Sequence, residues 1–271
     1  MLKKCWFYTN KEVDIMNYSQ KSFEILTRIF LYVSICYMMN KTCDKLIFSQ
    51  KLKGYITLKK EEVYGHIDHT LLKAFCTTEQ IEAIAEEALK YGTASICIPA
   101  SFVNYIHNKY KDVNICTVIG FPLGYSTTSI KVAEAKQAIE DGANEIDMVI
   151  NIGWAKEHKF DAVTEEIKAV KAACRDKILK VIIETCYLTD EEKIALCKCV
   201  SDAKADYIKT STGFGTGGAT LEDVKLMKAN VAPYVKVKAA GGMKTKADLF
   251  AFLEAGADRL GTSSGIKLLN E

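Results

Sequence analysis

From about residue 63 onward, apolar runs of strand length alternate with longer segments of helical period. Eight of these runs have the composition of strands, and they lie near residues 66–71, 93–98, 114–120, 145–151, 179–185, 206–210, 235–239 and 258–262. Strands that alternate with helices form βαβ units, in which neighbouring strands are parallel. The pattern therefore predicts a parallel sheet covered by helices.

The intervening segments predict helices over residues 78–90, 101–110, 128–141, 160–174, 190–203, 220–229 and 245–255. Residues that can cap free backbone amides precede or open five of them, namely Thr78, Ser101, Thr128, Thr189 and Thr220. Thr189 and Glu192 have the spacing of a capping box. Eight strand–helix pairs in about 210 residues predict a (β/α)8 TIM barrel. A doubly wound sheet is the alternative, although no G-x-G-x-x-G follows the first strand.

Residues 1–60 differ from the rest, because apolar and aromatic clusters mix there with lysine and the first glycine is Gly54. We therefore divide the chain into an N-terminal extension, residues 1–60, and a barrel domain, residues 61–271. The apolar run 29–39 has 11 residues, whereas a membrane-spanning helix needs about 20, so we expect no membrane association. A packed helix, or translated upstream sequence before a start at Met38 or Met39, would explain the extension.

The overall composition favours a small-molecule partner in a reducing compartment. The net charge is +2 and no dense Lys/Arg block is present, which argues against nucleic acid as a partner. Several of the ten cysteines lie in apolar runs, as buried free thiols do, and we expect a cytoplasmic protein. No C-x₂-C pair or H-E-x-x-H motif occurs, so we expect no metal site.

Three charged residues interrupt apolar strands: Asp147, Lys209 and Lys238. A buried ion pair that fixes the barrel core would explain one lysine and the aspartate, but the second lysine leaves a surplus positive charge. A lysine near a second cation in a desolvated pocket is favoured in its unprotonated, nucleophilic form. We therefore predict that one of the two lysines forms a Schiff base and that Asp147 moves protons. Lys236 is interpreted as a structural lysine that extends to solvent.

Two glycine- and serine-containing loops suggest an anion site. Gly241 and Gly242 follow the seventh predicted strand, and Ser263 and Ser264 follow the eighth. TIM-barrel enzymes often bind phosphate at these two positions, through loop amides and a short helix. We therefore expect a phosphorylated carbonyl compound as the substrate.

Seven segments together resemble the deoxyribose-phosphate aldolase family. They are "IDHTLLK" (67–73), "CTVIGFPLG" (116–124), "EIDMVINIG" (145–153), "KVIIETCYLTDEE" (180–192), "IKTSTGFGTGGAT" (208–220), "VKAAGG" (237–242) and "RLGTSSG" (259–265). The resemblance covers about residues 64–269. It implies a class I aldolase that needs no cofactor and interconverts 2-deoxy-D-ribose 5-phosphate with D-glyceraldehyde 3-phosphate and acetaldehyde. It also implies a homo-oligomer, a dimer or a tetramer, that acts in deoxyribonucleoside catabolism.

The resemblance also assigns roles to residues. Lys209 of "IKTSTG" becomes the Schiff-base lysine, Lys238 the neighbouring cation and proton relay, and Asp147 the acid/base partner. Asp68 is expected to orient Lys238. The substrate and its phosphate are expected to contact Thr210, Thr212, Gly241, Gly242, Ser263 and Ser264.

Two features depart from the family pattern. The first 60 or so residues have no counterpart in it, and Phe214 stands where some members carry a phosphate-binding lysine. Two other functions stay open from the residues alone. One is a different Schiff-base barrel aldolase, of the transaldolase or fructose-phosphate type, and the other is a catalytically silent phosphate-binding protein.

Overall fold

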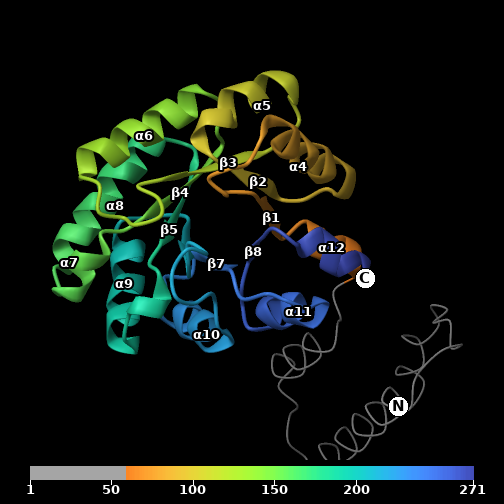
Figure 1. Cartoon of the computed structure of the whole chain (residues 1–271). Coiled ribbons are helices and arrows are strands. Elements are labelled where there is room, and N and C mark those ends of the chain that lie inside the picture. Colours follow the sequence, from red (N-terminus) through yellow and green to blue (C-terminus); the bar gives the residue numbers. More distant parts are fainter. Residues whose placement is uncertain (1–58) are drawn as a thin grey trace, which may run out of the picture. The chain divides into compact units, whose positions relative to one another are not determined.

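The computed structural model describes residues 59–271, with strands at the centre and helices around them (Figure 1). The strands are β1 (Ile67–Thr70), β2 (Ser95–Ile98), β3 (Ile115–Ile119), β4 (Glu145–Val149), β5 (Ile178–Ile182), β6 (Tyr207–Lys209), β7 (Lys236–Ala240) and β8 (Arg259–Thr262). They pair in parallel and in chain order, and β8 pairs with β1, so the sheet closes. The predictions for residues 1–58 lie outside the described residues.

The closed sheet confirms the predicted (β/α)8 barrel, and the alternative of a doubly wound open sheet is wrong. Each of the eight predicted strands overlaps an observed one, but several end earlier than predicted. The run at 206–210, for example, supplies a strand of three residues, Tyr207–Lys209. Apolar residues continue past the strand ends because the barrel mouth buries them too.

The barrel is surrounded by helices α3 (Lys60–Tyr64), α4 (Thr78–Tyr91), α5 (Val103–Lys109), α6 (Thr128–Glu140), α7 (Ile152–Lys156), α8 (Phe160–Cys174), α9 (Asp190–Asp202), α10 (Leu221–Asn230), α11 (Lys246–Glu254) and α12 (Gly265–Asn270), with 3₁₀ turns η2 (Ala100–Phe102) and η3 (Thr185–Tyr187). All seven predicted helices are present. The sequence missed α3, α7 and α12, because five or six residues are too few to show a helical period. Within residues 59–271, no helix combines the length and apolarity that crossing a membrane requires.

Two of the predicted helix caps are displaced by one residue. Thr78 and Thr128 are the first residues of their helices, and the caps are Thr77 and Thr127, whose backbones are extended. Adjacent threonines look equivalent in a sequence, and the backbone turn decides which of them is the cap. Ser101 lies within η2, one turn before α5 begins. The capping box is confirmed, since Glu192 accepts a hydrogen bond from the Thr189 amide at 2.8 Å.

The hydrophobic core lies between the barrel and its helices, whereas the barrel interior is polar. On β4, Ile146 and Met148 belong to the same apolar cluster as Val163 and Ile167 of α8. Successive side chains of a strand point to opposite faces, so the intervening Asp147 faces the barrel interior. The same alternation on the other strands gathers charged side chains inside the barrel, which is where the candidate site lies.

Candidate active site

A cavity of about 430 Å³ opens at the carboxyl ends of β1, β6, β7 and β8. Its lining includes Lys209, Thr212, Gly241, Gly242, Ser263 and Ser264, all of which the sequence predicted as site residues. Lys238 does not line this cavity and is completely buried. Of the two lysines between which the residues alone could not choose, Lys209 is therefore the one that reaches the space for a substrate.

Asp147 joins the two lysines. Its Oδ2 atom lies 2.8 Å from Lys209 Nζ and 2.7 Å from Lys238 Nζ. Burial by itself would raise the pKa of Asp147, but the charges of the surrounding lysines hold its pKa well below the usual range. Asp147 is therefore ionised at neutral pH and can accept a proton from either neighbour.

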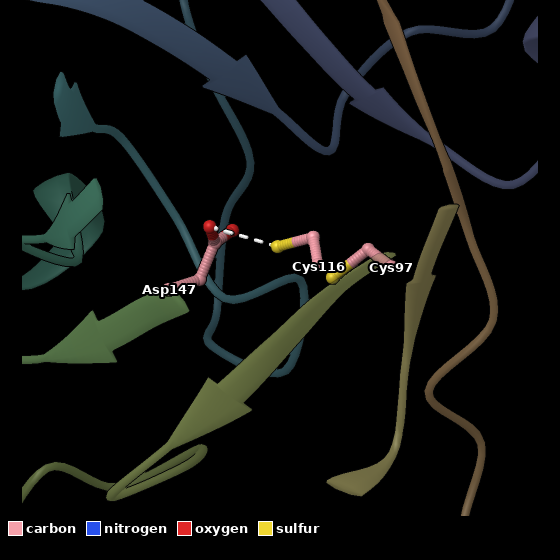
Figure 2. A group of neighbouring side chains, drawn as sticks. All are labelled: Cys97, Cys116 and Asp147. Carbon is pink, nitrogen blue, oxygen red and sulfur yellow. Dashed lines mark hydrogen bonds between the residues drawn. The ribbon is translucent and has the colours of Figure 1, made fainter. Parts of the chain in front are cut away.

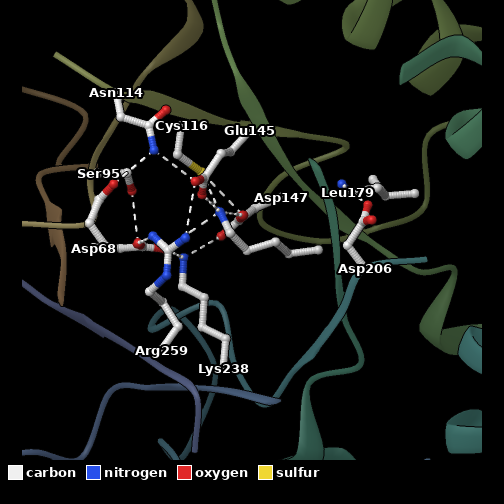
Figure 3. A network of polar contacts seen from close by, with 12 residues as sticks. Asp68, Ser95, Asn114, Cys116, Glu145, Asp147, Leu179, Asp206, Lys238 and Arg259 are labelled. Carbon is white, nitrogen blue, oxygen red and sulfur yellow. Dashed lines mark hydrogen bonds and ion pairs between the residues drawn. The ribbon is translucent and has the colours of Figure 1, made fainter. Parts of the chain in front are cut away.

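Lys238 lies between two carboxylates. Besides Asp147, its ammonium group forms an ion pair with Asp68, and Arg259 and Ser95 bind the other oxygen of Asp68 (Figure 3). Burial lowers the pKa of Lys238, but Asp147 and Asp68 outweigh this and raise its pKa above the ordinary value. The contact places Asp68 beside Lys238, as the resemblance implied, and keeps the Lys238 side chain charged.

The sequence analysis missed a second layer of the same network. Lys180 on β5 lies 2.8 Å from Asp147 Oδ1 and 2.6 Å from Glu145 Oε2, and Arg259 on β8 lies 3.0 Å from Glu145 Oε1. Side-chain exposures of 0% for Lys180 and 2% for Glu145 make these ion pairs part of the barrel interior. Asp147 was predicted as a site residue because it is a charge inside an apolar strand. The same criterion applies to Glu145, Lys180 and Arg259.

The network keeps the predicted surplus of positive charge, although it has more members than predicted. Its four basic groups are Lys180, Lys209, Lys238 and Arg259, and its three acidic groups are Asp68, Glu145 and Asp147, which leaves one net positive charge. A surplus cation in a buried site attracts an anionic substrate. Lys209 is the member of this network that lines the cavity, where such a substrate could reach it.

Cys97, Cys116 and Asp147 lie close enough together to resemble a metal-ligand cluster (Figure 2). Cys116 Sγ lies 3.1 Å from Asp147 Oδ1, and burial raises the pKa of Cys116 well above its usual value. The ammonium group of Lys180 lies 3.2 Å from the same sulfur. A metal ion here would meet a protonated thiol and the lysines already bound to Asp147, so this donor set does not fit a metal.

The predicted phosphate end is built from tight loops. Gly241 and Gly242 have φ angles of 72° and 81°, a conformation that favours glycine. A side chain at Gly242 would meet the Ala219 carbonyl oxygen at 2.9 Å, so this loop lies directly against the loop that connects β6 to α10. Two cations not selected from the sequence, Lys73 and Lys244, also line the cavity.

The two predicted threonines differ in position. Thr212 lines the cavity, whereas Thr210 is buried and outside the lining. Thr210 follows the inward-facing Lys209 and therefore points to the other face, where its hydroxyl accepts a hydrogen bond from the Ala240 amide at 3.1 Å. In this structure Thr210 thus joins β6 to β7 rather than facing a substrate.

Glu184 is a buried acid that the sequence did not single out. It follows β5 with a φ of +55°, and its carboxylate accepts hydrogen bonds from the amide and the hydroxyl of Thr212. Among residues 59–271, no basic side chain lies within ion-pair distance of it. Thr212 in turn accepts a hydrogen bond from the Phe214 amide at 3.0 Å, so Glu184 anchors the loop after Lys209.

Comparison with known proteins agrees with this geometry. Residues 59–269 match the model of the family described as DeoC/LacD family aldolase. A deoxyribose-phosphate aldolase of Clostridium botulinum (strain Alaska E43 / Type E3) is 61% identical over 213 residues, 78% of this chain and 96% of that protein. One from Clostridioides difficile (strain 630) is 56% identical over 207 residues, 75% of this chain and 93% of that protein.

A solved structure, the tetrameric deoxyribose phosphate aldolase of Aeropyrum pernix, matches with a TM-score of 0.75 and 32% identity over 81% of this chain and 94% of that chain. The fold, the lysine at the end of β6 and these similarities define a (β/α)8 aldolase, an enzyme that forms and breaks carbon–carbon bonds. The chain belongs to the DeoC/LacD aldolase family.

Proposed function

We propose that the protein is a class I deoxyribose-phosphate aldolase in which Lys209 forms the Schiff base. The reaction interconverts 2-deoxy-D-ribose 5-phosphate with D-glyceraldehyde 3-phosphate and acetaldehyde. One observation carries the assignment of Lys209: the residue lines the cavity, and its Nζ atom lies 2.8 Å from an aspartate that a second buried lysine also contacts. This arrangement provides a nucleophile, a base and a cation at one point.

The first step is formation of the iminium. Unprotonated Lys209 attacks the C1 aldehyde of the open-chain sugar, and its proton passes toward Asp147, which is ionised and within hydrogen-bonding distance. Loss of water from the carbinolamine then gives the iminium. Lys238 is charged and bound to the same carboxylate oxygen, so it can return a proton to the departing hydroxyl.

The second step breaks the C2–C3 bond. A base removes the proton of the C3 hydroxyl through a water held by Asp147 and Lys238, and the C2–C3 bonding electrons move into the iminium. The products are the aldehyde of glyceraldehyde 3-phosphate and an enamine on Lys209. Protonation of the enamine carbon and hydrolysis of the resulting iminium release acetaldehyde and regenerate Lys209. In this scheme Asp68 positions Lys238 and does not touch the substrate.

The phosphate group would lie at the other end of the cavity. Gly241, Gly242, Ser263 and Ser264 offer amides and hydroxyls there, and Lys73 and Lys244 on the same lining add positive charge. These two lysines supply the charge that Phe214 does not. We assign the enzyme, without a cofactor, to deoxyribonucleoside catabolism in the cytoplasm. We also expect it to act as a homo-oligomer, a dimer or a tetramer, without nucleic acid or membrane partners.

A donor and acceptor panel tests this function against a different Schiff-base aldolase. With glyceraldehyde 3-phosphate as the acceptor, acetaldehyde should serve as donor, and dihydroxyacetone phosphate and dihydroxyacetone should not. The Lys209→Ala variant should show no turnover in the same assay. Efficient use of dihydroxyacetone phosphate would contradict the proposed substrate, and normal turnover by Lys209→Ala would contradict the proposed nucleophile.

A further inference from the structure

A second buried ion pair lies outside the catalytic network. Lys131 of α6 and Glu166 of α8 both have side-chain exposures of 0%, and Lys131 Nζ lies 2.9 Å from Glu166 Oε1. Neither residue lines the cavity or contacts Asp147. Two ionised groups are costly to bury, so their presence here requires a reason.

The hydrogen bonds of the pair account for every charge-bearing atom. The three N–H groups of Lys131 have three acceptors: Glu166, the Gly124 carbonyl at 2.7 Å and the Val149 carbonyl at 2.8 Å. The other oxygen of Glu166 accepts from the Asn151 amide at 3.1 Å. Burial lowers the pKa of Lys131 and raises that of Glu166, which opposes both charges. The three acceptors around Nζ fit the three N–H groups of an ammonium, and the two donors fit the two oxygens of a carboxylate.

The backbone groups that the pair binds belong to two segments at the barrel mouth. Gly124 lies in the loop between β3 and α6, and Val149 and Asn151 lie at the end of β4. The loop is pressed onto that strand end, because a side chain at Gly124 would lie only 1.9 Å from the Ile150 carbonyl oxygen. The ion pair thus clamps the β3–α6 loop against β4.

The clamped loop reaches the substrate cavity through two aromatic rings. Phe121, three residues before Gly124, makes an edge-to-face contact with Phe214, with ring centroids 5.3 Å apart. Phe214 lines the cavity together with Gly241, Gly242, Ser263 and Ser264, the residues proposed to bind the phosphate. A loop that moves away from β4 would withdraw Phe121 and leave Phe214 unsupported.

We propose that Lys131 and Glu166 are positioning residues that hold the Phe121–Phe214 wall of the substrate cavity. The proposal rests on the proposed placement of the phosphate end. Because the wall does not include Lys209, Asp147 or Lys238, the pair should affect capture of the phosphorylated sugar and not the amine chemistry. Loss of the clamp should therefore raise KM and leave kcat nearly unchanged.

The main test is the double variant Lys131→Met/Glu166→Gln, which removes both charges and keeps an amide oxygen for the Asn151 amide. We expect the KM for 2-deoxy-D-ribose 5-phosphate to rise about tenfold with kcat within about twofold of the parent. Lys136→Met, an exposed lysine on the same helix, is the control and should change neither constant. A folded double variant with an unchanged KM would overturn the proposal.

A second variant keeps the test decisive if the double variant does not fold. Phe121→Ala removes the ring contact without touching the ion pair and should reproduce the rise in KM. An unchanged KM in Phe121→Ala would also overturn the proposal. Borohydride trapping of Lys209 with acetaldehyde distinguishes a failure of this proposal from a failure of the proposed function. Trapping should stay at the parent level in every variant, whereas its absence in the parent enzyme would instead contradict the proposed function.

Discussion

Replacing Lys180 by methionine tests whether the charges inside the barrel form one interdependent network. Lys180 is fully buried and lies within 3.5 Å of Asp68, 2.6 Å of Glu145 and 2.8 Å of Asp147. Methionine is similar in length, so the change removes the charge with little change in packing. Removing one partner of a buried pair typically costs about 3–5 kcal/mol, and here Glu145 and Asp147 would each lose a buried ion-pair partner.

This cost converts into a measurable change in melting temperature. For a domain of this size, about 3–5 kcal/mol corresponds to a fall in Tm of about 6–20 °C. Thermal unfolding followed by circular dichroism measures it. Lys225→Met, an exposed lysine on α10, is the matched control and should change Tm by about 2 °C or less. A Lys180→Met variant that melts like this control would refute the reasoning.

Titration of Asp147 gives the stability of the protein a predicted pH dependence. Because the folded pKa of Asp147 is depressed, its ion pairs contribute stability above the unfolded pKa of about 3.9. That contribution is lost as the pH falls through the folded pKa. The stability difference between the parent protein and Asp147→Asn, which cannot titrate at this position, should therefore be full near pH 7 and should shrink below about pH 4. A difference that stays constant down to pH 2 would contradict this assignment of the charges.

Two further substitutions address the chemistry and the substrate. Asp147→Asn should lower kcat about 10²–10⁴-fold in steady-state kinetics, because the amide cannot accept a proton. A kcat within twofold of the parent value would show that Asp147 does not take part in the mechanism. Phe214→Lys should lower the KM for 2-deoxy-D-ribose 5-phosphate about tenfold through a charge-assisted hydrogen bond to phosphate. The same variant should leave the KM for unphosphorylated 2-deoxy-D-ribose unchanged, and equal effects on both sugars would place Phe214 away from the phosphate.

The sequence predicted the barrel well because its signal is periodic and repeated. Few folds other than the (β/α)8 barrel are compatible with eight apolar runs separated by helical segments. The closed eight-stranded sheet of the structure confirms this prediction. The helix caps were less certain, since Thr77 and Thr78 offer the same hydroxyl and only the backbone turn distinguishes them. Short elements such as α7 carry no period and were missed.

The candidate site could be predicted only where a motif or an isolated charge marked it. Asp147, Lys209 and Lys238 stand out within apolar strands, and the structure brings them together. Lys180 meets the same criterion but was not predicted, because it is the second residue of the predicted strand 179–185, where a lysine resembles a surface residue. In the structure it is the middle residue of β5. The parallel pairing of β4 with β5 places Lys180 directly beside Asp147, and neither strand shows this register by itself.

Ion pairs between helices that are far apart in the sequence could not be predicted from the sequence. Lys131 and Glu166 lie 35 residues apart, each on the buried face of its helix, beside Ala135 of α6 and Ile167 of α8. The sequence can show a charge on such a face, but it does not show which distant residue is its partner. Only the packing of α6 beside α8 buries both residues and joins them to the mouth of the barrel.

The central claim is that Lys209 is the nucleophile, and borohydride reduction in the presence of acetaldehyde tests it most directly. Reduction of the Schiff base adds about 28 Da to one lysine, which peptide mass mapping locates. We expect the label on Lys209 and none on Lys180 or Lys238. Label on Lys238 would keep the aldolase and reverse the roles of the two lysines. A folded protein that takes up no label would contradict the Schiff-base mechanism itself.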